Sequence, residues 1–293
     1  MFPVSPWGPL AALLLLLPLL GFGLAGETWT RAVQRLPVKF QIMLPAVSVA
    51  CYLLVVVPAG LFAWHWLALY LLLPPAVTAL LSVASARDPE QGGHWLDWLV
   101  LLVLGLTVDL RWLGPAWPHH LTFLNKLLLF DVGLYGFQAV RRLDGVGLDL
   151  RWRWRDWKLG TREFFFYAPI AIALGLAIGF LHIHRHVAHP WWALAAWCFT
   201  YVTIALPEET FFRGWMQNLM ERRLGRTASL LLTSFFFGLA HFNKRAAHFN
   251  WRYVLLATLA GVFYGRAWRA DRRISASAIT HACVDTVWGA LLR

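Results

Sequence analysis

Six ionisable side chains interrupt three strongly apolar segments in the second half of the chain, within the stretches PEETFFRGW, SFFFGLAHF and THACVD. They are Glu208, Glu209, Arg213, His241, His281 and Asp285. Ionisable residues are costly inside a membrane, so in such segments they indicate a functional site. A carboxylate beside an imidazole can hold a water molecule and remove its proton, while polar groups opposite can bind a developing oxyanion. The pattern predicts hydrolytic chemistry.

The spacing within the first stretch gives its two glutamates different roles. Glu209 and Arg213 lie four residues apart, so they share a helix face and can form an ion pair that offsets the cost of burying either charge. Glu208 projects ~100° away around the same helix, which directs its carboxylate toward His241. The sequence therefore predicts Glu208 as the reactive carboxylate and Glu209 as a supporting one.

Helical rise predicts that Glu208 and His241 lie at one depth. Glu208 is ~21 Å from the basic turn at Arg222, and His241 is ~22 Å from the other side of that turn at Arg226. Because the two helices run antiparallel across the short turn RRLGR, the two side chains can meet. Phe237 lies on the same helix face as His241.

The last apolar segment brings a second polar pair to the same zone. His281 lies ~12 Å along a helix from Arg273, and Asp285 lies ~18 Å along it on the same face. A buried structural network that holds the helices together is the alternative for such residues. Six ionisable side chains on three helices at matched depth favour a catalytic site.

Composition places these segments in a membrane. The 293 residues are 59% hydrophobic and 14% charged, with a mean hydropathy of +0.56. Apolar runs long enough to cross ~30 Å of hydrocarbon as helices recur along the chain, and tryptophans cluster near their ends. We predict an all-α, polytopic transmembrane helix bundle of about ten helices (roughly eight to ten). The predicted helices lie near 7–25, 42–62, 65–86, 96–113, 121–139, 164–182, 191–222, 228–242, 253–267 and 274–292.

The basic residues follow membrane topology. They alternate by loop, as the positive-inside rule requires, so the net charge of +11 does not indicate a nucleic-acid partner. This distribution predicts that both chain termini lie outside. The first apolar run lacks a preceding Lys or Arg, which argues against a cleaved secretory signal. Cys51, Cys198 and Cys283 all fall within predicted spans, so neither a disulfide framework nor a zinc ribbon is expected.

One long polar segment divides the chain. The predicted domains are 1–140, transmembrane helices of unknown role; 141–163, a basic cytoplasmic linker; and 164–293, which carries the reactive residues. The linker is expected to lie on anionic lipid, with docking of an acidic partner as the alternative. In the long helix 191–222 a break or kink is predicted at Pro207.

The three motifs resemble those of a known family of membrane proteases. EExxxR at 208–213, FxxxH at 237–241 and HxxxD at 281–285 match, in order and spacing, the CAAX protease and bacteriocin-processing family (CPBP or ABI, with its Rce1-like branch). The similarity extends over about 190–290. It implies that 164–293 is the domain of an intramembrane glutamic endopeptidase that needs no cofactor.

The resemblance also implies roles for individual residues, but one position departs from it. It assigns Glu208 and His241 to water activation, Glu209 and Arg213 to bracing the helix, Phe237 to support, and His281 with residue 285 to the oxyanion. The prenyl-protease branch has asparagine where this chain has Asp285, and an ionised aspartate cannot donate a hydrogen bond. Asp285 would have to be protonated, or it would orient His281 instead.

Three other functions stay open. A zinc-dependent version of the same protease would use Glu208, His241 and His281 as ligands with one open position. A transporter with a broken helix is disfavoured because no inverted repeat is visible. A non-catalytic immunity or scaffold protein of the same fold would carry the motifs without turnover. The HExxH, GxSxG and GxGD motifs of other intramembrane proteases are absent from the sequence.

Two further groups of residues invite interpretation. The run HIHRHVAH at 182–189 has an irregular period and is predicted to be an interfacial loop, not a metal site. Ser234, Tyr264 and Thr280 are predicted either to donate to the reactive groups or simply to pack.

The expected partners are the lipid bilayer and a membrane-anchored protein or peptide substrate. The resemblance implies cleavage near the substrate's C-terminus. Short loops and chain length favour a bacterial branch of the family and hence a multi-pass protein of the bacterial inner membrane.

Overall fold

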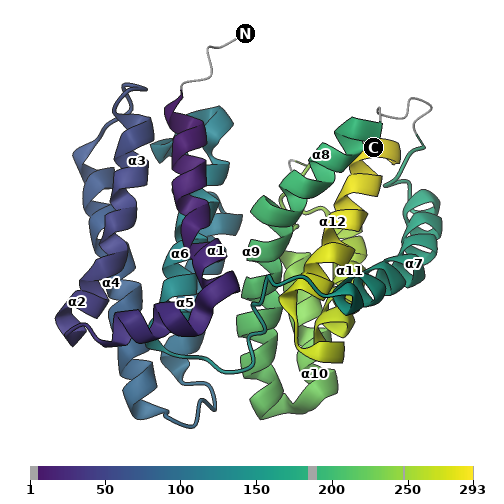
Figure 1. Cartoon of the computed structure of the whole chain (residues 1–293). Helices are drawn as coiled ribbons and strands as arrows, with labels where there is room; N and C mark the ends of the chain where they lie inside the picture. The colour runs from purple at the N-terminus through teal and green to yellow at the C-terminus, as the bar shows by residue number, and fades with distance from the viewer. Residues whose placement is uncertain (1–5, 184–189, 247, 293) are drawn as a thin grey trace. The chain divides into compact units, whose positions relative to one another are not determined.

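The computed structural model describes residues 6–183, 190–246 and 248–292 and confirms the all-α prediction, because these residues form helices and turns without a strand. Within these described residues, four helices are long and apolar enough to cross a membrane: Trp7–Gln34, Val38–Val56, Trp64–Arg87 and Trp154–Ala177. The chain divides into two compact units, Met1–Asp144 and Gly145–Arg293. Figure 1 shows the helices of each unit.

The described part of unit 1, from residue 6 onward, forms six α-helices. They are α1 (Trp7–Gln34), α2 (Val38–Met43), α3 (Val49–Val56), α4 (Trp64–Arg87), α5 (Trp95–Asp109) and α6 (Phe123–Tyr135). A 3₁₀ turn, Leu44–Ser48, joins α2 to α3, two more at Gly114–Ala116 and His119–Leu121 precede α6, and a π-helical turn, Gly136–Val140, follows α6. The helix predicted to end at 25 is interrupted at Ala25 and then continues to Gln34.

A buried arginine ties three helix ends of unit 1 together. The Arg141 side chain is 1% exposed; its Nε donates to Asp97 Oδ1 (2.9 Å), and its Nη2 lies 2.7 Å from Asp88 Oδ2. Burial raises the pKa of Asp88, but hydrogen bonds from Gly92, Gly93 and Arg141 outweigh it and leave the pKa below its usual value. Arg141 is thus part of a protein core and not of a lipid-facing basic linker.

Substituting Arg141 with methionine is expected to lower the free energy of unfolding by about 3–5 kcal/mol. The change leaves the fully buried Asp97 carboxylate without its cation. Thermal unfolding in detergent micelles measures the effect, and Arg142→Met, at the exposed neighbouring position, is the matched control. Equal unfolding temperatures for the two variants would show that the Arg141 network contributes little.

Unit 2 contains the reactive residues. Its elements are α7 (Trp154–Ala177), α8 (Pro190–Thr200), a π-helical stretch (Tyr201–Ala205), α9 (Leu206–Glu209), a second π-helical stretch (Thr210–Gln217), α10 (Asn218–Leu239), α11 (Trp251–Asp271) and α12 (Ile274–Leu291). The helix α12 packs against α7, α8 and α11 (Figure 1). The predicted short turn between antiparallel helices is confirmed at Gly225, where φ is +74° inside α10.

Two boundaries of unit 2 differ from the predictions. The helix predicted over 164–182 begins at Trp154, so the end of the predicted linker is helical. The segment around Pro207 stays helical, and its interruption takes the form of the two π-helical stretches on either side of α9. Because proline lacks an N–H and its ring crowds the preceding turn, a wider helical turn accommodates it.

Candidate active site

Glu209 is the centre of a fully buried polar cluster. Arg213 Nε donates to its Oε2 at 3.0 Å, which confirms the predicted ion pair, and both side chains are 0% exposed. Ser277 Oγ donates to the same oxygen, and His281 Nδ1 lies 2.8 Å from Oε1. One carboxylate therefore joins the π-helical stretch after α9 to two successive turns of α12.

Ser277 was missed by sequence reasoning, although its spacing could have indicated it. It lies four residues before His281 and therefore on the same face of α12. Its hydroxyl is also 2.9 Å from the carbonyl of Tyr264, so it links α12 to α11 as well as to Glu209. This helix contact places the face of α12 that bears His281 against Glu209.

Another face of α12 packs closely against α7. Thr280 Oγ1 donates to the carbonyl of Gly160 at 3.0 Å. A Cβ at Gly160 would lie 2.7 Å from the Ile279 side chain and 2.8 Å from the Ala276 carbonyl, so a larger residue would separate the helices. Of the residues predicted to donate or pack, Thr280 thus joins two helices, whereas the Ser234 hydroxyl bonds the carbonyl of Leu230 in its own helix.

His281 has a charged neighbour at each ring nitrogen. Because Nδ1 faces the Glu209 carboxylate, this nitrogen carries a proton and donates. Nε2 lies 3.6 Å from Asp285 Oδ2 and 3.9 Å from Glu208 Oε2. The ring stacks on Tyr264, with centroids 4.7 Å apart and planes at 14°. Carboxylate oxygens therefore flank both ring nitrogens of His281.

His241 presents the opposite hydrogen-bonding pattern. Its Nδ1 lies 2.8 Å from the carbonyl oxygen of Phe237, which can only accept, so Nδ1 donates. In the neutral ring, Nε2 therefore keeps its lone pair and can accept a proton. The ring is buried between Phe237, with centroids 4.9 Å apart, and Tyr253, with centroids 4.8 Å apart. The predicted facing of Phe237 and His241 is confirmed.

Glu208 differs from its neighbour in exposure. Its side chain is 25% exposed, compared with 0% for Glu209, and it approaches His281. The predicted pairing of Glu208 with His241 stays a prediction.

A cavity lies beside these groups, walled by α7, α11, α12 and the end of α10. Its polar lining residues are His241, His281, Asp285, Tyr167, Tyr253 and Tyr264. The other walls are aliphatic and aromatic, with Phe164, Leu256 and Trp288 among them. Such a cavity can accept an apolar chain and present one polar end of it to the two histidines.

The zinc-dependent alternative, with Glu208, His241 and His281 as ligands, stays a hypothesis. In the described parts of the chain, no group of three or more His, Cys, Asp or Glu side chains could hold a metal ion. Of the histidine-rich run at 182–189, residues 184–189 lie outside the described residues.

Part of the chain matches the model of a known protein family. Residues 190–287, from α8 into α12, match the family described as type II CAAX prenyl endopeptidase Rce1-like. The matched segment contains Glu208, His241, His281 and Asp285 but not α7. No curated protein and no solved structure matches the chain.

Proposed function

Because residues 190–287 place this membrane protein in the Rce1-like (CPBP) protease family, we propose that it is a glutamic intramembrane endopeptidase that cuts membrane-anchored proteins. The observation that carries the proposal is a pair of histidines that line one cavity and whose ring nitrogens have different neighbours. His241 Nδ1 faces a backbone carbonyl, which leaves Nε2 as a proton acceptor in the neutral ring, whereas His281 has a carboxylate beside each ring nitrogen. A base and an oxyanion donor are what hydrolysis of a peptide bond requires.

The first half of the reaction uses Glu208 and His241. A water molecule between the Glu208 carboxylate and His241 Nε2 loses a proton to one of them as its oxygen bonds to the scissile carbonyl carbon. The carbonyl π electrons move onto oxygen, and the His281 Nε2–H donates to that oxyanion. Collapse of the intermediate breaks the C–N bond, and the proton taken from water passes to the leaving amine, which balances the reaction.

Asp285 acts on His281 in this mechanism. At 3.6 Å from Nε2 its carboxylate supports the imidazolium, so a charged aspartate here needs no proton of its own. This role accounts for aspartate at a position where the prenyl-protease branch has asparagine. Glu209 and Arg213 hold the opposite side of the ring and brace the helix.

The site also indicates the class of substrate. An apolar cavity beside the reactive groups suits a protein whose C-terminal segment lies in the bilayer, cut near that end. We also propose a bacterial inner membrane as the location, because the loops are short, and an orientation with both termini outside, because of the distribution of the basic residues.

The test is cleavage of a reporter with a C-terminal membrane anchor by the purified protein in liposomes. His241→Gln is expected to lower kcat by about 10²- to 10⁴-fold, because it removes a proton acceptor. Mass spectrometry of the products identifies the scissile bond, and a chelator arm is expected to leave activity unchanged. His65→Gln, at an exposed histidine in unit 1, is the matched control. Near-normal cleavage by folded His241→Gln, or loss of cleavage on chelation, would contradict this mechanism.

A further inference from the structure

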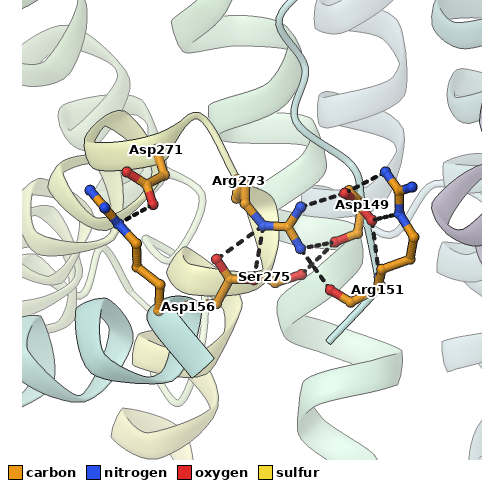
Figure 2. Close-up of polar contacts among 7 residues, drawn as sticks. Asp149, Arg151, Asp156, Asp271, Arg273 and Ser275 are labelled. Atoms are coloured by element: carbon orange, nitrogen blue, oxygen red, sulfur yellow. Dashed lines mark hydrogen bonds and ion pairs between the residues drawn. The ribbon is translucent and has the colours of Figure 1, made fainter. Parts of the chain in front are cut away.

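Arg273, the residue before α12, has a buried guanidinium that joins two other segments (Figure 2). Its side chain is 5% exposed. Nε lies 3.0 and 2.8 Å from the carboxylate oxygens of Asp156, in the first turn of α7, and Nη1 pairs with the Asp149 carboxylate. Nη2 donates to the carbonyls of Asp149 (3.0 Å) and Arg151 (2.8 Å). Arg273 therefore ties the start of α12 both to α7 and to residues 145–151, which we call the strap.

The strap is also fixed through its backbone. Three hydrogen bonds join its carbonyls to α11 and α12: Ile274 N to Gly147 O (2.9 Å), Ser275 Oγ to Asp149 O (2.9 Å) and Trp268 Nε1 to Val146 O (3.0 Å). Gly147 has a φ of +79°, and a Cβ there would overlap the Arg272 carbonyl. The strap thus fits the corner between the two helices only with glycine at this position.

The reactive face of α12 follows directly from this anchored end. Helical rise puts Ser277 about 6 Å and His281 about 12 Å along the axis from Arg273. Both residues bond Glu209, and the His281 contact of 2.8 Å would be lost after an axial shift of about 1 Å. A displacement of the strap would therefore shift α12 along its axis and move His281, the proposed oxyanion donor, which lies about two turns away.

The charge of Asp149 is well supported at neutral pH. Burial raises the pKa of this carboxyl, but hydrogen bonds from Arg151 and Arg273 outweigh burial and hold the pKa well below its usual range. The Asp149 carboxylate is therefore charged at neutral pH and can pair with Arg273. Neither Asp149 nor Arg273 lines the cavity, so any effect of theirs on the reaction must pass through the helices that Arg273 joins, α7 and α12.

We infer that the strap sets the axial position of α12 and that Arg273 is the positioning residue through which it holds His281 against Glu209. The inference rests on the proposed function. It gives residues that precede the matched segment, 190–287, a part in the reaction. The strap, which directly follows unit 1 in the sequence, then belongs to the catalytic domain.

The experiment measures kcat and KM for the full-length protein in liposomes with the anchored reporter. Gly147→Ala and Asp149→Asn are each expected to lower kcat by about 10- to 100-fold, because a displacement near 1 Å is costly in a site of this kind. KM should stay within about twofold, since the cavity is untouched. Arg155→Ala is the matched control, because it removes an ion pair with Asp271 in which the Arg155 side chain is 70% exposed.

The outcomes separate positioning from folding and from a failure of the proposed function. Assays are run on monodisperse protein well below the unfolding temperature. If Gly147→Ala does not fold, the kcat of Asp149→Asn, which keeps the side-chain volume, tests the strap inference. If folded Gly147→Ala and Asp149→Asn keep the wild-type kcat while Glu208→Gln is inactive, the strap inference is overturned and the protease function stands. A raised KM with unchanged kcat also overturns it. Wild-type protein that cuts no anchored reporter removes the proposed function and this inference with it.

Discussion

Glu208→Gln is expected to lower kcat by about 10²- to 10⁴-fold while changing the free energy of unfolding by no more than about 0.5 kcal/mol. The glutamine keeps the shape of the side chain but cannot accept a proton from water. The side chain is 25% exposed and belongs to the edge of the buried network, so the fold does not depend on its charge. Loss of activity without loss of stability is the signature of a residue that acts on substrate.

The measurement pairs reporter cleavage with thermal unfolding of the same preparation. Single-turnover assays at saturating enzyme separate chemistry from product release. Folded Glu208→Gln protein with more than a tenth of wild-type kcat would remove Glu208 from the mechanism. In that case the proton acceptor would have to be His241 alone.

Glu209→Ala is expected to have the opposite signature, with activity and about 3–5 kcal/mol of stability lost together. The change leaves the Arg213 guanidinium, which is 0% exposed, without the carboxylate that pairs with it. The Nη1 and Nη2 atoms of Arg213 have no hydrogen-bond partner within the described structure. His281 and Ser277 lose their acceptor at the same time. Thermal unfolding and reporter cleavage measure the two losses.

A double variant distinguishes the two contributions of Glu209. Glu209→Gln combined with Arg213→Met removes both buried charges at similar volume, which is often neutral or stabilising. We expect unfolding near the wild-type temperature and kcat still reduced, because His281 has lost the carboxylate that orders it. Recovery of full activity in the double variant would contradict the role given to the contact between Glu209 and His281.

Local spacing made contacts between side chains four residues apart on one helix predictable. Glu209 with Arg213 and Phe237 with His241 depend on separations of four residues, and both pairs form as expected. The turn at Gly225 was also predictable, because a short basic segment between two apolar runs allows few other conformations.

Contacts between distant segments were not predictable in this way. Ser277 contacts Glu209 only because α12 lies against α9. The close approach of α7 and α12 at Gly160 depends on packing between helices, which sequence periodicity does not predict. Arg141 and Arg273 look alike in the sequence as members of basic segments. Their burial follows from aspartates far away in the chain, Asp97 and Asp156.

The π-helical stretches beside α9 were missed for a related reason. Pro207 is the one signal of an irregularity in this part of the sequence, and a break, a kink or a widened turn can each accommodate a proline in a helix. The choice depends on which neighbours the following side chains meet, and here it brings Glu209 to α12.

The strap and α7 restrict how this domain could be exchanged between proteins. The segment that matches the family begins at residue 190, yet Asp149, Asp156 and Gly160, which hold α12, all precede it. A chimaera that transplanted only 190–287 into a relative would carry His281 on a helix whose anchoring partners stayed behind. Grafts should therefore move 145–177 together with the motif-bearing helices, and α7 and α12 should accept substitutions as a coordinated pair.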